Sequence, residues 1–169
     1  MQRNAADLAG AMRRHAKLVY SLAYSRTQNS ADAEDIFQEV FLRMAQRRTP
    51  FQSTEHEKAW LIRVTANLST NLIASAWRRH VTLHACLPER RSVQTEENDL
   101  DSAMKRLPER DRALLYLRYS EGYTPAEIAG FLGDSEQAIR KRITRARKRL
   151  GILLSEQEKE ADENVCDRI

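Results

Sequence analysis

Apolar residues recur along this chain at intervals of three and four, the spacing of one helix face, and no stretch alternates as a half-buried strand does. The pattern predicts a first helix over about 5–26 and, after the break TQNS, a second helix for which Ser30 serves as N-cap. Their apolar faces consist of Leu8, Met12, Val19 and Leu22, and of Ile36, Phe37, Val40, Phe41 and Met44.

A long third helix follows the loop RRTPFQS. Thr54 and Glu57 have the T-x-x-E spacing of a capping box, which predicts a helix over about 55–80. Residues 81–97 lose periodicity and contain Pro88 and Ser92, which is typical of a linker. Two more helices are expected, near 99–106 and from Pro108 to about residue 120, with Gly122 as a C-terminal cap.

The segment TPAE at 124–127 is a second capping box, with proline at the first helical position. It opens a short helix through Leu132, Gly133 permits a tight turn, and Asp134 or Ser135 caps the helix that follows. This order is that of a helix-turn-helix. We therefore predict an all-α fold of two small helical domains, about 1–80 and 98–154, joined by a flexible linker at 81–97 and followed by a tail at 155–169.

The charge is distributed unevenly. The net charge of the whole chain is +4, but two segments depart from it in opposite directions. Residues 135–150 include seven basic residues and one acidic residue, whereas residues 155–169 include six acidic residues and two basic ones. A concentrated basic face indicates nucleic acid, and the acidic end indicates a solvated tail or partner segment. Cys86 and Cys166 lack the spacing of a zinc site or disulfide framework, and we expect no cofactor. With no apolar run of membrane-spanning length and no signal peptide in MQRNAADLAG, we expect a cytoplasmic protein without direct membrane insertion.

The basic segment SEQAIRKRITRARKRL predicts a helix long enough to lie in a major groove. Ile139, Ile143, Ala146 and Leu150 form a stripe that faces a core. Recognition helices contact bases mainly through their N-terminal residues. The DNA-facing candidates are Gln137, Arg140, Lys141, Thr144 and Arg145, with Glu136 beside them. A solvated basic helix is the alternative interpretation.

A polar stripe follows the long third helix. On a helical wheel its members fall within a sector of roughly 100°; they are Arg63, Asn67, Thr70, Asn71, Ala74 and Arg78. The arginine, asparagine and threonine side chains among them can donate hydrogen bonds to phosphates and base edges, and Trp60 nearby can stack on an unpaired base. An ordinary solvated face, and core packing of Trp60, are the alternatives.

Three carboxylates lie on one face of the second helix, at Asp32, Asp35 and Glu39. A metal site, a docking surface for a basic partner and a solvated face all fit this spacing. Acidic residues are also expected in a first helical turn because they interact favourably with the helix dipole.

Three segments together resemble the extracytoplasmic-function (ECF) sigma factors of bacterial RNA polymerase. VYSLAYSRTQNSADAEDIFQEVFLRM (19–44) and AWLIRVTANLSTNLIASAWRR (59–79) are similar to parts of sigma region 2, and residues 107–150 are similar to region 4. The resemblance implies that Asp35, Gln38 and Glu39 dock on the β′ clamp helices of polymerase core, and that the β subunit of core is also a partner. It implies −10 contacts by Trp60, Arg63, Asn67, Asn71 and Arg78 and the loop at about 49–54, and −35 contacts by the basic helix. It also implies an anti-sigma factor, often membrane-linked in this family.

Two departures from the family pattern concern specificity. Asn71 stands where aspartate is common, and Gln137, Ala138 and Ile139 replace the usual Gly-Thr-Val opening of the recognition helix. The resulting hypothesis is a promoter-specificity subunit without a catalytic site, which binds promoter DNA. The alternatives are a polymerase-independent helix-turn-helix regulator and a nucleic-acid-processing enzyme that uses the carboxylates of the second helix.

Overall fold

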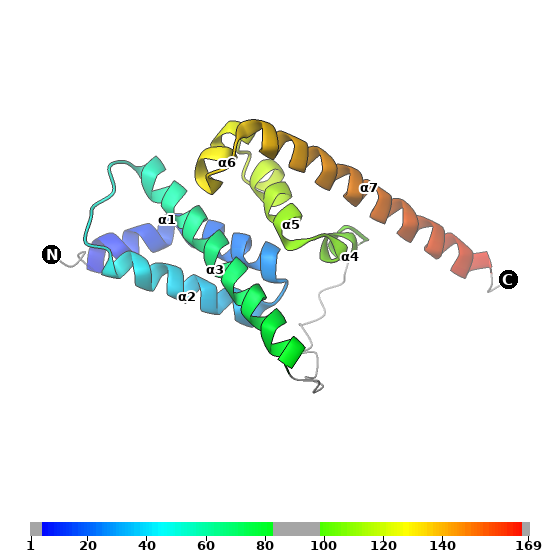
Figure 1. Ribbon diagram of the computed structural model, residues 1–169, viewed down its shortest axis with the longest axis horizontal. Coiled ribbons are helices and arrows are strands. Elements are labelled where there is room, and N and C mark those ends of the chain that lie inside the picture. Colours follow the sequence, from blue (N-terminus) through cyan, green and yellow to red (C-terminus); the bar gives the residue numbers. More distant parts are fainter. Residues whose placement is uncertain (1–4, 83–98, 167–169) are drawn as a thin grey trace.

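The computed structural model describes residues 5–82 and 99–166, with the backbone alone at 5, 6, 76–82, 158 and 160–166. Every regular element in these ranges is helical, as predicted (Figure 1). The elements are α1 (Ala5–Thr27), α2 (Ser30–Gln46), α3 (Thr54–Thr82), α4 (Asp99–Arg106), α5 (Glu109–Leu115), the π-helical turn η1 (Tyr116–Ser120), α6 (Pro125–Leu132) and α7 (Glu136–Cys166). Almost all of the predicted linker lies outside the described residues.

Helices α1, α2 and α3 form the N-terminal unit. The apolar faces predicted for α1 and α2 meet α3 in one core, in which Val19, Val40, Met44 and Leu61 are at most 1% exposed. The start of α2 differs by one residue from the prediction. Asn29, whose backbone is extended, is the N-cap and accepts a hydrogen bond from the Asp32 amide at 3.1 Å, so Ser30 is already helical.

The capping box predicted at Thr54 and Glu57 is wrong. Thr54 is the first residue of α3, and the hydroxyl that accepts from the His56 amide, at 3.1 Å, belongs to Ser53. Glu57 is buried instead, where Arg14 donates to its Oε1 at 2.9 Å and His15 Nε2 lies 3.1 Å from the same oxygen. Tertiary packing against α1 thus takes the carboxylate that local capping would have used.

Helices α4 to α7, with η1, form the C-terminal unit. The capping box at α6 is confirmed: Thr124 Oγ1 accepts from the Glu127 amide at 3.2 Å, and Glu127 Oε2 accepts from the Thr124 amide at 2.7 Å. Gly133 ends α6 at φ 75°, a left-handed conformation that glycine adopts without strain. Ser135, not Asp134, accepts from the Ala138 amide at the start of α7, at 3.2 Å. Pro108 is the N-cap of α5 and precedes its first turn.

Helix α7 continues well beyond the predicted basic segment and includes most of the predicted tail. It extends through Cys166, and Figure 1 shows its second half projecting away from the rest of the molecule. The acidic segment is rich in Glu, Gln, Lys and Ala, which favour helix, and Arg106 of α4 pairs with Glu156 at 3.0 Å. The predicted boundary at residue 154 is therefore not a helix end.

The two units pack against each other through a shared core. Leu18, Leu22 and Ile62 of the N-terminal unit contact buried residues of the C-terminal unit, which are Ala113, Leu114, Leu117, Ile128, Ala129, Ile139 and Ile143. The predicted fold of two separate domains did not include this joint core. Residues more than 90 positions apart in the chain consequently pack together.

Arg112 fastens this interface with hydrogen bonds to main-chain carbonyls. Its guanidinium donates to Ser25 and Arg26 of α1, each at 2.6 Å, and to Lys105 at 3.2 Å and Leu107 of its own unit. The side chain is buried, and burial lowers its pKa from the usual arginine value. Because the C-terminal carbonyls of a helix lack intrahelical partners, a cation at the end of α1 satisfies them and complements the helix dipole.

Candidate nucleic-acid interface and protein-docking strip

The basic half of α7 has one buried face and one exposed face. Ile139 and Ala146 are fully buried and Ile143 nearly so, as the apolar stripe predicted. All five predicted −35 residues are exposed; they are Gln137, Arg140, Lys141, Thr144 and Arg145. The fold thus presents these side chains to solvent while α5 and α6 hold the opposite face.

Intrahelical contacts orient part of this exposed face. Glu136 Oε1 accepts from Arg140 Nε at 2.8 Å and lies 2.6 Å from its Nη2, and Thr144 donates to the Arg140 carbonyl at 3.0 Å. Two other arginines of α7 pair with acids of the same unit: Arg142 with Asp134 at 2.9 Å, and Arg149 with Asp111 at 2.6 Å. The basic residues of α7 therefore divide between an open face and structural ion pairs.

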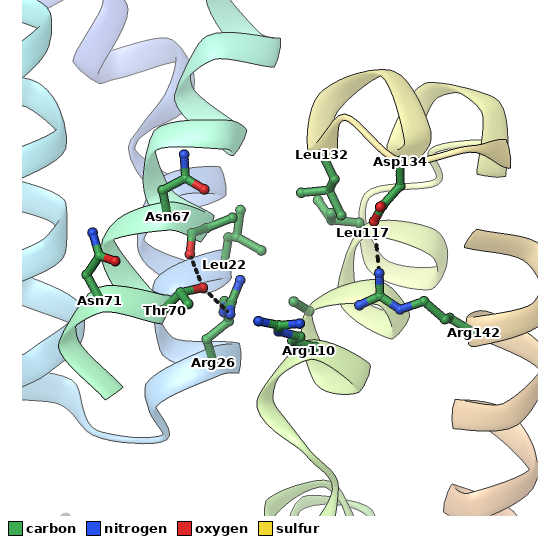
Figure 2. Close-up of a pocket in the computed structure, with 12 residues that line it drawn as sticks. Leu22, Arg26, Asn67, Thr70, Asn71, Arg110, Leu117, Leu132, Asp134 and Arg142 are labelled. Carbon is green, nitrogen blue, oxygen red and sulfur yellow. Dashed lines mark hydrogen bonds and ion pairs between the residues drawn. The ribbon is translucent and has the colours of Figure 1, made fainter. Parts of the chain in front are cut away.

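The polar stripe of α3 faces the C-terminal unit. Arg63 donates from Nε to the Phe131 carbonyl at 3.0 Å and from Nη2 to the Gly130 carbonyl at 3.1 Å. Asn67 and Asn71 are exposed and line a cavity of about 410 Å³ between the units (Figure 2). These three predicted −10 residues are thus on one side of α3, as expected, and that side faces α6 and the cavity between the units.

Trp60 is half-buried and belongs to the edge of the N-terminal core. Its ring lies 5.5 Å from that of Phe51, and the Arg47 guanidinium is 5.6 Å from the Trp60 ring centroid. In this arrangement Trp60 packs in the core, which was the alternative to stacking on a base. Arg78 is in α3, but its side chain lies outside the described residues.

The predicted docking residues form an exposed strip on α2. Asp35 and Gln38 point to solvent, and Glu39 pairs with Arg43 at 2.6 Å. Leu42, which the sequence reasoning missed, is 52% exposed on the same face. Leu42 follows Asp35 by seven residues and Gln38 by four, and this helical spacing could have indicated from the sequence that the three share one face. We call Asp35, Gln38, Glu39 and Leu42 the docking strip.

Neither a metal site nor a spanning helix is found in 5–82 and 99–166. Within these ranges no group of three or more His, Cys, Asp or Glu side chains is placed to hold a metal ion, Asp32, Asp35 and Glu39 included. Over the same residues, no helix has both the length and the apolar character needed to cross a membrane.

Arg26 is a further site residue that sequence reasoning missed. Its side chain is 6% exposed, donates from Nη2 to Thr70 Oγ1 at 2.8 Å and lies 3.8 Å from Glu109 Oε1. Burial is the main reason that its pKa is lowered to about 10. Arg26 ends an amphipathic helix in the sequence, where a solvated cation is the usual expectation, so no local signal indicated its burial.

A second cavity, of about 610 Å³, has a different character. It lies between α1, α4, η1 and α7, and its lining includes Tyr20, Tyr24, Tyr116 and Tyr119 together with Leu100. Tyr119 is 56% and Leu100 49% exposed. Aromatic and apolar side chains of this kind are typical of protein contact surfaces rather than of phosphate contacts.

Comparison with known families agrees with the two-unit organisation. The Sigma-70 region 2 family matches residues 11–79, and the Sigma-70 region 4 family matches residues 97–150. The first range covers nearly all of α1 to α3, and the second covers α4 to the basic half of α7. The two candidate nucleic-acid faces therefore fall within separate family regions.

Curated relatives match over most of this chain. The probable RNA polymerase sigma factor RfaY of Xanthomonas campestris is 32% identical over 76% of the chain, and the ECF RNA polymerase sigma factor SigE of Mycolicibacterium smegmatis is 31% identical over 91%. The chain spans 36% of the former and 64% of the latter. The ECF RNA polymerase sigma factor SigL of Mycobacterium tuberculosis is 30% identical, with 84% of this chain and 85% of SigL covered.

A solved structure shares the arrangement of helices. The sigma factor RpoE of Bartonella quintana, crystallised with the anti-sigma factor NepR, superimposes with a TM-score of 0.73 at 21% identity. The match covers 88% of this chain and 97% of RpoE. At this identity the likeness concerns the fold.

Proposed function

This chain belongs to the extracytoplasmic-function sigma factors, and we propose that it directs bacterial RNA polymerase core to specific promoters and has no catalytic site of its own. The observation that carries the proposal is the presence, in one chain, of three exposed surfaces. These are the docking strip of α2, the Asn67 and Asn71 side of α3, and the basic face of α7. A helix-turn-helix regulator that acts without polymerase requires only the last of them.

Each surface has a proposed partner. The docking strip meets polymerase core at the β′ clamp helices, since acidic and amide side chains around one exposed leucine suit a basic surface with an apolar centre. Arg63, Asn67 and Asn71 contact the −10 element, whose unpaired bases expose their edges and faces. Gln137, Arg140, Lys141, Thr144 and Arg145 contact the −35 duplex in the major groove. A subunit with these partners acts in the cytoplasm.

DNA engagement requires the two units to separate. Arg63 is bound to the Gly130 and Phe131 carbonyls, and Asn67 and Asn71 face the C-terminal unit across the cavity. In the described arrangement the −10 side of α3 therefore faces the C-terminal unit across this cavity instead of open solvent. Binding of the −10 strand would favour the separated state, because its contacts with the Arg63, Asn67 and Asn71 side of α3 are fully available only there.

We further propose that an anti-sigma protein restrains this factor. RpoE, which shares its fold, was crystallised with the anti-sigma factor NepR. The exposed Tyr119 and Leu100 supply the apolar surface that a protein partner buries on binding. The proposal is regulation by protein contact rather than by a chemical reaction of this chain.

The test is run-off transcription with purified core polymerase on a library of genomic promoter fragments. The proposed function predicts transcripts that depend on adding this protein and that share two upstream elements. Specific, tight binding to duplex DNA by the protein alone, with no polymerase-dependent transcript, would instead favour a helix-turn-helix regulator. Metal-dependent cleavage of DNA that Asp35→Ala abolishes would favour an enzyme.

A further inference from the structure

The cavity between the two units is lined mostly by polar and charged side chains. Arg26 comes from α1, Asn67, Thr70 and Asn71 from α3, Arg110 from α5 and Arg142 from α7 (Figure 2). Both units therefore contribute to one space of about 410 Å³, a volume within the range of small-molecule sites.

The lining carries an excess of positive charge. Three arginines against one aspartate, Asp134, leave a net charge of +2. Asp134 is already paired with Arg142 at 2.9 Å. Behind the lining, Glu109 lies 3.8 Å from Arg26 and 4.0 Å from Arg110, and the buried cation Arg112 offsets it. The two positive charges thus remain uncompensated by the nearby acids.

Arg26 is the arginine of the lining that this excess of positive charge affects most. Its side chain is 6% exposed, and its Nε is buried with no hydrogen-bond partner among the described residues. Besides burial, repulsion from Arg110, Arg112 and Arg142 lowers its pKa. A buried donor without a hydrogen-bond partner carries a free-energy cost.

We propose that this cavity binds a small, free ligand that carries a dianionic phosphate group. A phosphate ester has a charge of about −1.5 to −2 near neutral pH and three acceptor oxygens, which match the charge and the donors of the lining. Guanidinium groups bind such oxyanions in bidentate geometry, and the side-chain amides of Asn67 and Asn71 complete the set. A ligand with a single carboxylate has a charge of −1 and would neutralise only half of the net charge of the lining.

The ligand would bridge the two units. Contacts with Arg26 and Asn67 on one side and with Arg110 and Arg142 on the other are made together only when the units are packed as described. Binding therefore stabilises the arrangement in which the two units are packed together. Under the proposed function, on which this consequence rests, the ligand also competes with the −10 strand for Asn67 and Asn71.

The test is isothermal titration calorimetry of the full chain with inorganic pyrophosphate as the probe. We expect saturable binding that weakens as salt increases, because the attraction is electrostatic. Arg110→Gln should weaken binding by about fivefold or more, as one charged hydrogen-bond donor is lost. Asp134→Asn, which removes the carboxylate of the lining, should tighten binding roughly two- to fivefold. Arg13→Gln, an exposed arginine of α1 outside the cavity, makes the same change in net charge and should have no effect.

Three results would overturn the proposal: no saturable binding at about 10 mM pyrophosphate, an equal loss in Arg13→Gln and Arg110→Gln, or weaker binding by Asp134→Asn. A parallel titration with a short thymidine oligonucleotide separates a free phosphate from the DNA backbone. Binding of the oligonucleotide without binding of pyrophosphate would assign the cavity to DNA and contradict the proposal. Because the titration contains no polymerase, its failure leaves the transcription test of the proposed function unaffected.

Discussion

Arg112 and Ser25 are 87 positions apart in the chain, yet Arg112 Nε donates to the Ser25 main-chain oxygen at 2.6 Å. The same guanidinium also binds Arg26 of α1 and Lys105 and Leu107 of its own unit. One buried cation therefore joins the end of α1 to the start of the C-terminal unit. Substitution of Arg112 therefore tests how much these contacts contribute to the packing of the two units.

Replacing Arg112 by methionine should destabilise the protein. The apolar side chain fills similar space but leaves several carbonyls without donors, so we expect the free energy of unfolding to fall by about 2–4 kcal/mol. Urea denaturation of the full chain measures this. Arg145→Met, at an exposed position of α7, is the matched control and should change stability by less than about 0.5 kcal/mol. Equal effects of the two substitutions would show that the buried hydrogen bonds of Arg112 contribute nothing to the free energy of unfolding.

Asp35→Arg should impair binding to polymerase core. Asp35 is exposed on the docking strip, so reversing its charge opposes a basic partner without disturbing the helix core. We expect the affinity for core to fall by about tenfold or more, measured by fluorescence anisotropy of labelled protein. Glu34→Arg makes the same charge change at a position about 100° away from Asp35 around the helix, and it should lower the affinity for core by less. Unchanged affinity in Asp35→Arg would remove this residue from the interface.

Arg140→Ala should weaken recognition of the −35 element. If Arg140 makes a bidentate contact with a base, the loss is about 1–3 kcal/mol and depends on the promoter sequence. Competition binding of holoenzyme to wild-type and altered −35 duplexes measures it. Lys148→Ala, near the middle of α7, should instead weaken binding to all sequences alike. A sequence-independent loss for Arg140→Ala would reduce its role to a phosphate contact.

Gly133→Ala should destabilise the helix-turn-helix. Gly133 has φ 75°, where a side chain costs about 1–2 kcal/mol although the space around it is open. Gly130 is the matched control, because it lies within α6 with equally open surroundings and without a positive φ. Gly130→Ala should be neutral or stabilising by up to about 1 kcal/mol. Thermal unfolding compares the two, and a similar melting temperature for both would contradict the turn assignment.

The stability of the protein should decrease as the pH is lowered through the ordinary histidine range. Burial lowers the pKa of His15 from 6.5, despite its contact with the Glu57 carboxylate, and the cations Arg14 and Lys58 act in the same direction as burial. Below pH 6.5 the unfolded chain therefore takes up a proton at His15 more readily than the folded protein does. The free energy of unfolding then falls as the pH decreases from 6.5 toward the lowered pKa of His15.

Urea denaturation at a series of pH values checks this dependence. His15→Gln should reduce the slope of stability against pH, because the titrating group is removed. His56→Gln keeps His15 in place and should retain the slope of the unmodified protein. A slope that is the same in all three proteins would exclude His15 as its source.

Local signals in the sequence determined most of the secondary structure and the chemistry of the surfaces. The apolar spacing of Ile139, Ile143 and Ala146 gave the buried face of α7, and the pair Thr124 and Glu127 gave the start of α6. Such signals act within one or two helical turns, so they can be read without knowledge of the fold. Asp35 and Gln38, the proposed docking residues, could be assigned to one exposed face for the same reason.

Only the tertiary structure decided which of these groups meet. Glu57 has the spacing of a capping residue but is buried beside His15, and Arg63 has the position of a −10 contact but binds the carbonyls of Gly130 and Phe131. Arg26 and Arg112 look like surface cations in sequence and are buried between the units. Burial and hydrogen bonding between distant residues depend on how whole helices pack, and the spacing of residues along one helix carries no information about its neighbours.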